Sequence, residues 1–304
     1  MAKFNTVFDL VKAFPTEKSC TDHLADLRWD GNVVSPFDST SKVYDCGDGR
    51  YKCRNTNKYF NVKTGTIFEG AKIPMQKWFM AIYLLTTHKK GISSYQLATD
   101  IGVTQKTAWF ILHRLRYAME HSLFVKYMEG TVEVDETFVG GKNKNRHKDK
   151  KVKNSQGRSF KDKTPVLGMH QRNGNVKCVV VPDTKAESIQ PHIRQTVLPG
   201  SKVYSDEWWG YRGLGDKYTH LYVDHGKGQY AEGDVYTNTM EGFWNQFKRT
   251  VSNYNWISRK HMQKYADEIT FRYNFRSSKV SERFDYLLLG TNDKRLTYKT
   301  LINV

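Results

Sequence analysis

The spacing of apolar and polar residues divides the chain into a helical first part and a strand-rich second part. Residues 1–30 carry apolar residues at helical spacing, and Thr16 precedes the second of two predicted helices. Residues 31–70 place Gly, Asp and Asn between short β-prone pieces. This pattern predicts one hairpin around the GDG turn at 47–49. It predicts a second hairpin through Tyr59–Val62 and Thr66–Phe68.

Residues 74–121 are predicted to be helical throughout. Ser93 or Ser94 is suited to cap a short helix that ends near Asp100, and Thr104 is suited to cap a longer helix. The apolar face of the longer helix consists of Ala108, Ile111, Leu112 and Leu115. A short helix, a turn with glycine and a longer basic helix indicate a helix-turn-helix that contacts DNA. A plain three-helix packing unit has the same pattern and stays open as an alternative.

From residue 131 onward, the spacing of apolar residues predicts mainly strands. TVEVDETFV, TPVLGMHQR and NVKCVVVP are predicted strands, KAESIQPHIRQTVL is a predicted helix, and KVYSD and LYVDH are two further strands. Residues 238–252 and 259–275 are predicted helices. This order predicts an RNase H-like α/β domain, in which the first and fourth strands are neighbours.

The charge of the chain favours a polyanionic partner. The 304 residues include 48 Lys and Arg against 31 Asp and Glu, a formal net charge of +17. Such an excess is typical of proteins that bind nucleic acid, although a merely soluble basic protein has the same composition. Residues 142–163 hold ten Lys or Arg against two Asp, which indicates an insertion that grips DNA or, alternatively, a solvated loop. The predicted DNA-binding residues are Lys106, His113, Arg114, Arg116, Lys142, Lys144, Arg146, Lys148, Lys150, Lys151, Lys153 and Arg249.

Four cysteines, no signal-peptide pattern and no apolar run of membrane-spanning length predict a cytoplasmic protein that does not enter a membrane.

Three acidic residues and one lysine form the predicted catalytic site. Asp135 and Asp206 each end a short β-branched run, and Glu241 lies in the predicted helix that follows. Lys248 lies seven residues, or two helical turns, after Glu241, so both share one helix face. Carboxylate oxygens are the ligands that Mg²⁺ prefers, and a few carboxylates in a basic protein suit two-metal phosphodiester chemistry.

The neighbouring acids leave alternatives. Glu133, Glu136 and Glu207 are adjacent acids that could be the true ligands. A strand period of two puts Glu133 on the face of Asp135 and Glu136 on the opposite face. The third ligand is Glu241 or, alternatively, Asn238, which lies three residues earlier. Charge favours Glu241, and Asn238 suits the cap of the helix.

Several motifs together resemble bacterial insertion-sequence transposases of the DDE superfamily, specifically insertion-sequence family 1595. They are TGTIFEGAKIPMQKWFMAIYLL, TAWFILHRLR, VEVDETFVGGK, GKGQY, TNTMEGFWNQFKR and FRYNFR. The resemblance implies an RNase H-like core, Mg²⁺ with Mn²⁺ as a substitute, and cut-and-join chemistry. It carries the acidic triad onto Asp135, Asp206 and Glu241 and the downstream lysine onto Lys248. It also implies terminal inverted repeats and target DNA as partners, a homodimer or higher assembly on DNA, and a location at the bacterial nucleoid.

One departure from the family concerns its zinc ribbon. Relatives have two CxxC-type pairs, which fall here on Ser35 and Asp38 and on Cys53 and Thr56. Zinc needs about four ligands, so we expect the ribbon to keep its hairpins without zinc. Zinc bound by Cys46, Cys53 and a distant His is the alternative.

The chain is therefore expected to contain four segments. Residues 1–72 form helices and the degenerate ribbon, 73–128 the helix-turn-helix region, 129–280 the RNase H-like domain of mixed α/β (α+β) class, and 281–304 a tail. The expected activity is that of a DNA transposase. A catalytically inactive DNA-binding protein and an RNase H-like nuclease or resolvase are the alternatives.

Overall fold

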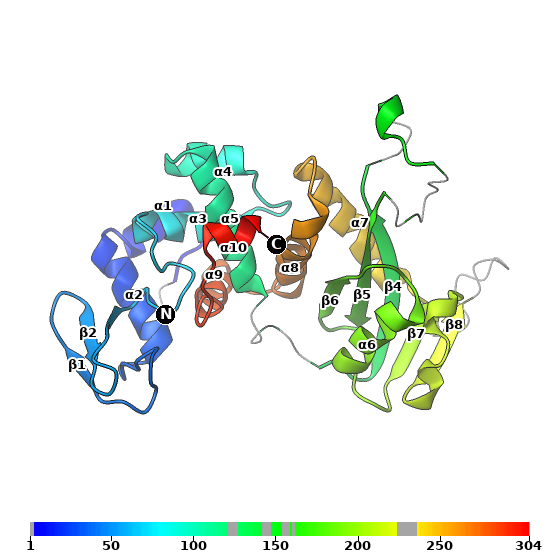
Figure 1. The fold of residues 1–304 in the computed structure, drawn as a ribbon, viewed down its shortest axis with the longest axis horizontal. Helices are drawn as coiled ribbons and strands as arrows, with labels where there is room; N and C mark the ends of the chain where they lie inside the picture. Colours follow the sequence, from blue (N-terminus) through cyan, green and yellow to red (C-terminus); the bar gives the residue numbers. More distant parts are fainter. Residues whose placement is uncertain are drawn as a thin grey trace. The chain divides into compact units, whose positions relative to one another are not determined.

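The chain folds into two compact units. The structure, a computed structural model, describes residues 3–120, 124, 127–141, 147–153, 159, 162–223 and 236–303. One unit consists of Met1–Leu123 with Ser277–Val304, and the other consists of Phe124–Arg276 (Figure 1). The last residues, expected to form a tail, are therefore part of the first unit. Within the described residues, no helix is both long enough and apolar enough to cross a membrane.

The first unit is mainly helical. Its helices are α1 (Val7–Ala13), α2 (Glu17–Trp29), α3 (Met75–Thr87), α4 (Ser94–Ile101), α5 (Gln105–Met119), α9 (Val280–Leu289) and α10 (Tyr298–Ile302). The side chains of Thr16, Ser93 and Thr104 each accept a hydrogen bond from a backbone N–H of the first helical turn. The predicted caps of α4 and α5 are thus confirmed, with Ser93 as the cap of α4, and Thr16 caps α2 in the same way. These side chains satisfy N–H groups that the helix leaves unpaired.

A cluster of aromatic rings joins the C-terminal residues to the first unit. Phe284 on α9 is fully buried, and its ring lies 5.1 Å from those of Phe4 and Phe79 and 6.1 Å from that of Phe14. Such ring pairs add to the stabilisation that burial alone provides. Helix α9 consequently packs against α2, α3 and α5 and belongs to this core.

A small antiparallel sheet of three strands carries the predicted hairpin. Strands β1 (Val43–Asp45) and β2 (Arg50–Cys53) pair around the turn at 47–49, as predicted. The predicted second hairpin is wrong, because β3 (Tyr59–Asn61) pairs with β2 and residues 66–68 form no strand. Consecutive turns bury Ile67 and Phe68 instead.

Of the four positions that correspond to zinc ligands, Cys53 ends β2, and Ser35, Asp38 and Thr56 line one pocket outside the sheet strands. Burial would raise the pKa of the Cys53 thiol, but hydrogen bonds from Ser35, Ser41 and Thr56 outweigh it and lower the pKa to about 6. Asp38 accepts a hydrogen bond of 2.8 Å from the Asn55 side chain. Polar contacts therefore link Cys53 to Ser35 and Thr56, whereas Asp38 is bound by Asn55.

Helix α5 corrects part of the predicted DNA-binding surface. His113, Arg114 and Arg116 are 0%, 6% and 1% exposed, so none of them forms a surface for DNA. The Arg114 guanidinium donates to the backbone oxygens of Ile67 at 2.6 Å and Leu296 at 3.0 Å. The prediction failed because α5 turns these three residues into the core, where Arg114 satisfies buried carbonyls, a use that the charge count does not reveal.

The second unit is built on one mixed sheet. Its strands are β4 (Thr131–Val139), β5 (Thr164–Gln171), β6 (Val176–Val180), β7 (Lys202–Asp206) and β8 (Thr219–Val223), in the order β6-β5-β4-β7-β8. Strands β4, β5 and β6 are antiparallel, whereas β7 and β8 run parallel to β4. The predicted contact between the first and fourth strands of this unit is confirmed.

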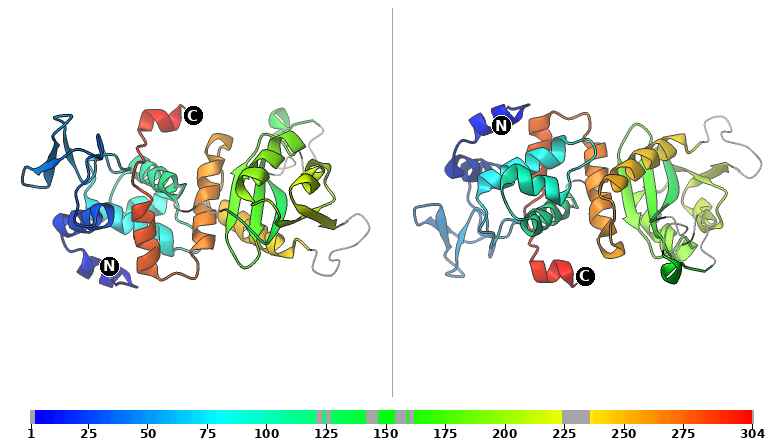
Figure 2. Two further views of the ribbon diagram at one scale, coloured as in Figure 1. Left: turned by 90° about the horizontal axis from the view of Figure 1, so that it is seen from below. Right: turned by 90° about the horizontal axis from the view of Figure 1, so that it is seen from above.

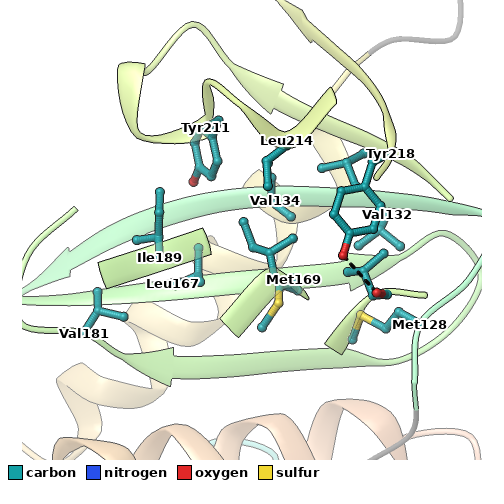
Figure 3. Close-up of a cluster of buried hydrophobic side chains, with 13 residues drawn as sticks. Met128, Val132, Val134, Leu167, Met169, Val181, Ile189, Tyr211, Leu214 and Tyr218 are labelled. Carbon is teal, nitrogen blue, oxygen red and sulfur yellow. Dashed lines mark hydrogen bonds between the residues drawn. The ribbon is translucent and has the colours of Figure 1, made fainter. Parts of the chain in front are cut away.

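Helices cover both faces of this sheet. On one face, α6 (Ala186–Thr196) packs on a core that includes Val132, Val134 and Tyr211 (Figure 3). The other face carries α7 (Asn238–Asn253) and α8 (Met262–Asn274), which lie together in both views of Figure 2. The short 3₁₀ helices of this unit are η3 (Lys148–Lys150), η4 (Trp209–Tyr211), η5 (Leu214–Asp216) and η7 (Arg259–His261).

We predict that Arg114→Ala lowers the free energy of unfolding by about 3 kcal/mol, because it leaves buried carbonyl oxygens without a donor. Urea denaturation of this variant and of the exposed Lys106→Ala measures the difference, and Lys106→Ala is expected to keep the wild-type midpoint. Wild-type stability of Arg114→Ala combined with weaker DNA binding would instead assign Arg114 to the DNA surface.

Candidate functional site

The register of the sheet brings Asp135 and Asp206 to the same level. Strand β4 pairs in parallel with β7 through Thr131 opposite Lys202 and Glu133 opposite Tyr204. The same offset of 71 residues relates Asp135 to Asp206. Because side chains alternate along a strand, both carboxylates lie on the sheet face that α7 covers. Asp206 is only 7% exposed.

One cavity combines these carboxylates with side chains from α7. It has a volume of about 410 Å³. Its lining consists of Asp135, Glu136, Thr137, Phe138, Asp206, Thr237, Glu241, Trp244, Asn245 and Lys248. All four predicted catalytic residues therefore border the same space, which we call the carboxylate cavity. Glu241 and Lys248 are exposed on α7, two turns apart, so the cavity opens to solvent along this helix.

The surroundings of Asp135 disfavour its negative charge. Burial raises the pKa of Asp135 to about 8, and repulsion from Glu136 and Asp206 adds to the increase. Two donors act in the opposite direction. The backbone N–H of Glu136 lies 2.8 Å from Oδ1, and the indole N–H of Trp244 lies 3.0 Å from Oδ2. The Trp244 contact also fixes the position of Asp135 relative to α7.

Glu136 has a partner on the other face of the sheet. The buried Tyr211 hydroxyl donates to its Oε2 at 2.5 Å. Burial, followed by the charge of Glu136, raises the pKa of Tyr211, so the phenol stays protonated as this donor. The opposite orientation predicted for Asp135 and Glu136 agrees with these contacts.

Glu133 is a structural carboxylate. It is fully buried, and its Oε1 accepts from Arg172 at 2.8 Å and from the Thr239 hydroxyl at 3.0 Å. Its Oε2 accepts from the backbone N–H of Met240 at 3.0 Å. The negative charge thus binds the N-terminal turn of α7, where unpaired N–H groups favour an anion. Glu133 holds the helix that carries Glu241.

Gly168 allows α7 to approach the sheet. It lies opposite Asp135 in the ladder between β4 and β5. A Cβ atom at this position would come within 2.0 Å of Met240 Cε and 2.6 Å of Trp244 Cζ2. Only glycine therefore fits beneath these two side chains.

The N-terminus of α7 corrects one prediction about the third ligand. Thr237 occupies the N-cap position without a side-chain cap bond, and Asn238 is the first helical residue. Asn238 is exposed and does not line the carboxylate cavity, whereas Glu241 does. The expected capping role of Asn238 is therefore wrong, because α7 begins at Asn238, one residue earlier than a cap at this position requires.

The donor set of the carboxylate cavity fits a divalent cation. Carboxylate oxygens are the hard ligands that Mg²⁺ and Mn²⁺ prefer. Asp135, Glu136 and Asp206 repel one another when they are ionised, and a bound cation would offset that repulsion. Among the described residues, however, no three His, Cys, Asp or Glu side chains are grouped closely enough to hold an ion as they stand. Glu241 would have to turn toward the two aspartates.

The remaining predicted DNA-binding residues fall into two groups, those that the structure describes and those that lie outside it. Lys106 and Arg249 are exposed, as are Lys148, Lys151 and Lys153. Lys150 belongs to η3. Lys142, Lys144 and Arg146 lie outside the described residues.

Sequence reasoning missed several residues that build the site. It considered Glu133 only as a ligand and did not single out Arg172, Gly168 or Tyr211. A buried acid two residues before Asp135 requires a cationic partner, which is a signal for a residue such as Arg172. The packing of Gly168 and Tyr211 requires the fold and has no local signal.

Comparison with known proteins places the second unit among transposases. Residues 127–274 match the family described as "ISXO2-like transposase domain". The chain is 30% identical over 275 residues to the "Uncharacterized protein in transposable element ISH50" of Halobacterium salinarum. The matched region covers 86% of this chain and 92% of that protein. It is 34% identical over 100 residues to an "Uncharacterized transposase-like protein" of Haemophilus influenzae. This second matched region covers 33% of this chain and 80% of that protein. No solved structure matches the chain.

We predict that Gly168→Ala lowers the free energy of unfolding by about 1–3 kcal/mol, because the added methyl group displaces Met240 and Trp244. Urea denaturation is the measurement. Gly215→Ala is the matched control, since a Cβ there meets nothing within 4 Å. Equal midpoints for the two variants would show that α7 does not pack closely over Gly168.

Proposed function

Because this chain belongs to the ISXO2-like transposases, insertion-sequence family 1595, we propose that it binds the ends of an insertion sequence and catalyses Mg²⁺-dependent strand cleavage and strand transfer. The observation that carries this proposal is the carboxylate cavity. Asp135, Asp206, Glu241 and Lys248 come from two strands and one helix, yet all four border it. A basic protein with clustered carboxylates is suited to cleave a polyanion.

We further propose that the second unit is RNase H-like. Its strand order of β6-β5-β4-β7-β8, with three antiparallel strands followed by two parallel ones, supports this assignment. The carboxylates of β4 and β7 come from adjacent central strands, as that fold requires.

Each residue of the cavity has a proposed role. Asp135 and Asp206 hold the divalent cations, and Glu241 completes the ligand set from α7. When bound, these cations activate the attacking oxygen and stabilise the leaving oxygen. Lys248 contacts a non-bridging oxygen of the scissile phosphate and offsets its charge. Trp244 keeps Asp135 in place through its indole N–H.

The proposed reaction has two steps, and water and DNA are its only reactants. In cleavage, the oxygen of water bonds to phosphorus while the bond from phosphorus to the 3′-oxygen breaks, so the strand end becomes a 3′-hydroxyl. In strand transfer, that hydroxyl attacks a phosphodiester of the target DNA, and the target's own 3′-oxygen leaves with a proton. No covalent bond between protein and DNA forms.

DNA contact is proposed for exposed cations in both units. On α5 only the first turn is available, because residues 111–116 are buried. The N-terminal residues of a recognition helix are those that reach base edges, which suits the exposed Lys106. Arg249 on α7 and Lys148, Lys151 and Lys153 are proposed to contact phosphates. The DNA partners are the element's terminal inverted repeats and its target, engaged by a homodimer or higher assembly.

We predict that Asp206→Asn lowers cleavage and joining more than about 100-fold, since loss of a metal ligand exceeds the effect of losing a supporting hydrogen bond. DNA binding stays within a few-fold of wild type, because the amide has nearly the same shape. The measurement uses labelled duplexes from both sides of the gene with Mg²⁺. Glu207→Gln, a neighbouring exposed acid, is the matched control and is expected to remain active.

The same assay separates the alternative functions. Nicking without joining by the wild-type protein would indicate a nuclease or resolvase. Binding without nicking would indicate a catalytically inactive DNA-binding protein. Cleavage by Asp206→Asn at the wild-type rate would remove Asp206 from the site.

We predict that Glu241→Gln loses nearly all cleavage, whereas Asn238→Ala retains both activity and stability. Glu241 borders the carboxylate cavity, and Asn238 is exposed outside its lining. Strand cleavage and thermal unfolding of both variants provide the test. An active Glu241→Gln together with a folded but inactive Asn238→Ala would reverse the assignment of the third ligand.

A further inference from the structure

A groove adjoins the carboxylate cavity on the side of the C-terminal end of α7. It has a volume of about 570 Å³, which lies in the range of pockets that enclose small organic ligands. Phe138 and Lys248 line both the groove and the cavity, so the two spaces are neighbours. Its lining also includes Lys163, Trp256 and Arg259. We call this space the Trp256 groove.

Trp256 presents a largely bare aromatic face at this groove. Its side chain is 79% exposed, whereas Trp244, which also belongs to this unit, is 4% exposed. An exposed indole alone is common at protein surfaces. Here it lies in a groove with three basic side chains and one acidic residue, Asp162, next to the proposed point of strand cleavage.

The backbone holds Trp256 in a defined position. Asn255 adopts a left-handed conformation with φ of 57°, which ends α7 and turns the chain. The N–H of Trp256 donates to the Tyr254 carbonyl at 2.6 Å. The Tyr254 hydroxyl in turn donates to Glu268 on α8 at 2.5 Å, and Glu268 is paired with Arg272. A turn anchored to a helix in this way positions an aromatic ring more firmly than a loose loop does.

Two features of the groove match the chemistry of unpaired DNA. Lys163, Lys248 and Arg259 supply positive charge for a phosphate backbone. An exposed indole stacks on the face of any base, provided that the base is not already stacked in a duplex. Because Lys248 borders both spaces, a strand whose phosphate lies at the carboxylates can extend past Lys248 to Trp256.

We propose that the Trp256 groove binds an unpaired nucleotide of the DNA strand next to the cleaved phosphate, with its base stacked on Trp256. The inference rests on the proposed function for the identity of the strand. The stacking itself does not depend on cleavage and can be measured with DNA of any sequence.

The first test measures affinity for fluorescein-labelled oligothymidylate and for a fully paired duplex of equal length without divalent ions. Trp256→Ala is expected to weaken binding of the single strand about tenfold and binding of the duplex less than twofold. Trp256→Phe, which keeps an aromatic face, should restore most of the loss. Trp209→Ala, which removes another exposed tryptophan outside this groove, is the matched control and should change neither affinity.

Salt dependence separates stacking from charge. Arg259→Ala should reduce the slope of log affinity against log salt by about 0.7 for the single strand, because one phosphate contact is lost. Trp256→Ala should leave that slope unchanged. Equal weakening of single strand and duplex by Trp256→Ala, or no weakening of either, would overturn the proposal.

A photochemical experiment tests the position of the nucleotide. Duplex DNA from the gene's flanks, with 5-iododeoxyuridine next to the cleaved phosphate, is irradiated with the protein, and the crosslinked peptide is identified by mass spectrometry. Crosslinking at Trp256 supports the proposal, and crosslinking only elsewhere contradicts it. Wild-type protein that fails to cleave any flank DNA, yet shows the Trp256 effect on oligothymidylate, would overturn the proposed function and leave the groove assignment intact.

Discussion

The close packing of α7 on the five-stranded sheet is the constraint on which the site depends. Gly168 leaves room for Met240 and Trp244 beneath the helix. Glu133 then binds the first turn of α7 through the Met240 N–H and the Thr239 hydroxyl. With both contacts made, α7 brings Glu241 and Lys248 to the edge of the cavity that the strands supply.

The carboxylates of β4 have two different roles, one in holding the fold together and one in the proposed chemistry. Glu133 is buried against Arg172 and hydrogen-bond donors, so its charge is compensated within the fold. For Asp135, two residues later on the same face, burial raises the pKa, and the charges of Glu136 and Asp206 raise it further. Groups with strongly shifted pKa values are concentrated at functional sites. A divalent cation at these carboxylates would stabilise the charged form of Asp135, which burial and the repulsion from Glu136 and Asp206 disfavour.

The sequence predicted the elements of the second unit well, because its strands and helices have clear periodicity and end at recognisable boundaries. It also predicted that the strands carrying Asp135 and Asp206 are adjacent, which the strand order confirms. It failed where the outcome depends on long-range packing. Arg114 is buried because α5 is enclosed within the first unit, and the segment at residues 66–68 turns inward and does not pair. The exposed face of Trp256 likewise depends on a turn that α8 anchors.

Anomalous diffraction from crystals of the protein with Mn²⁺ and cleaved end DNA tests the central claim most directly. The account predicts manganese within about 2.5 Å of carboxylate oxygens of both Asp135 and Asp206, with Glu241 turned toward it. Manganese held by Glu136 or Glu207 in place of these residues, or an ordered DNA end with no manganese in the carboxylate cavity, would contradict it.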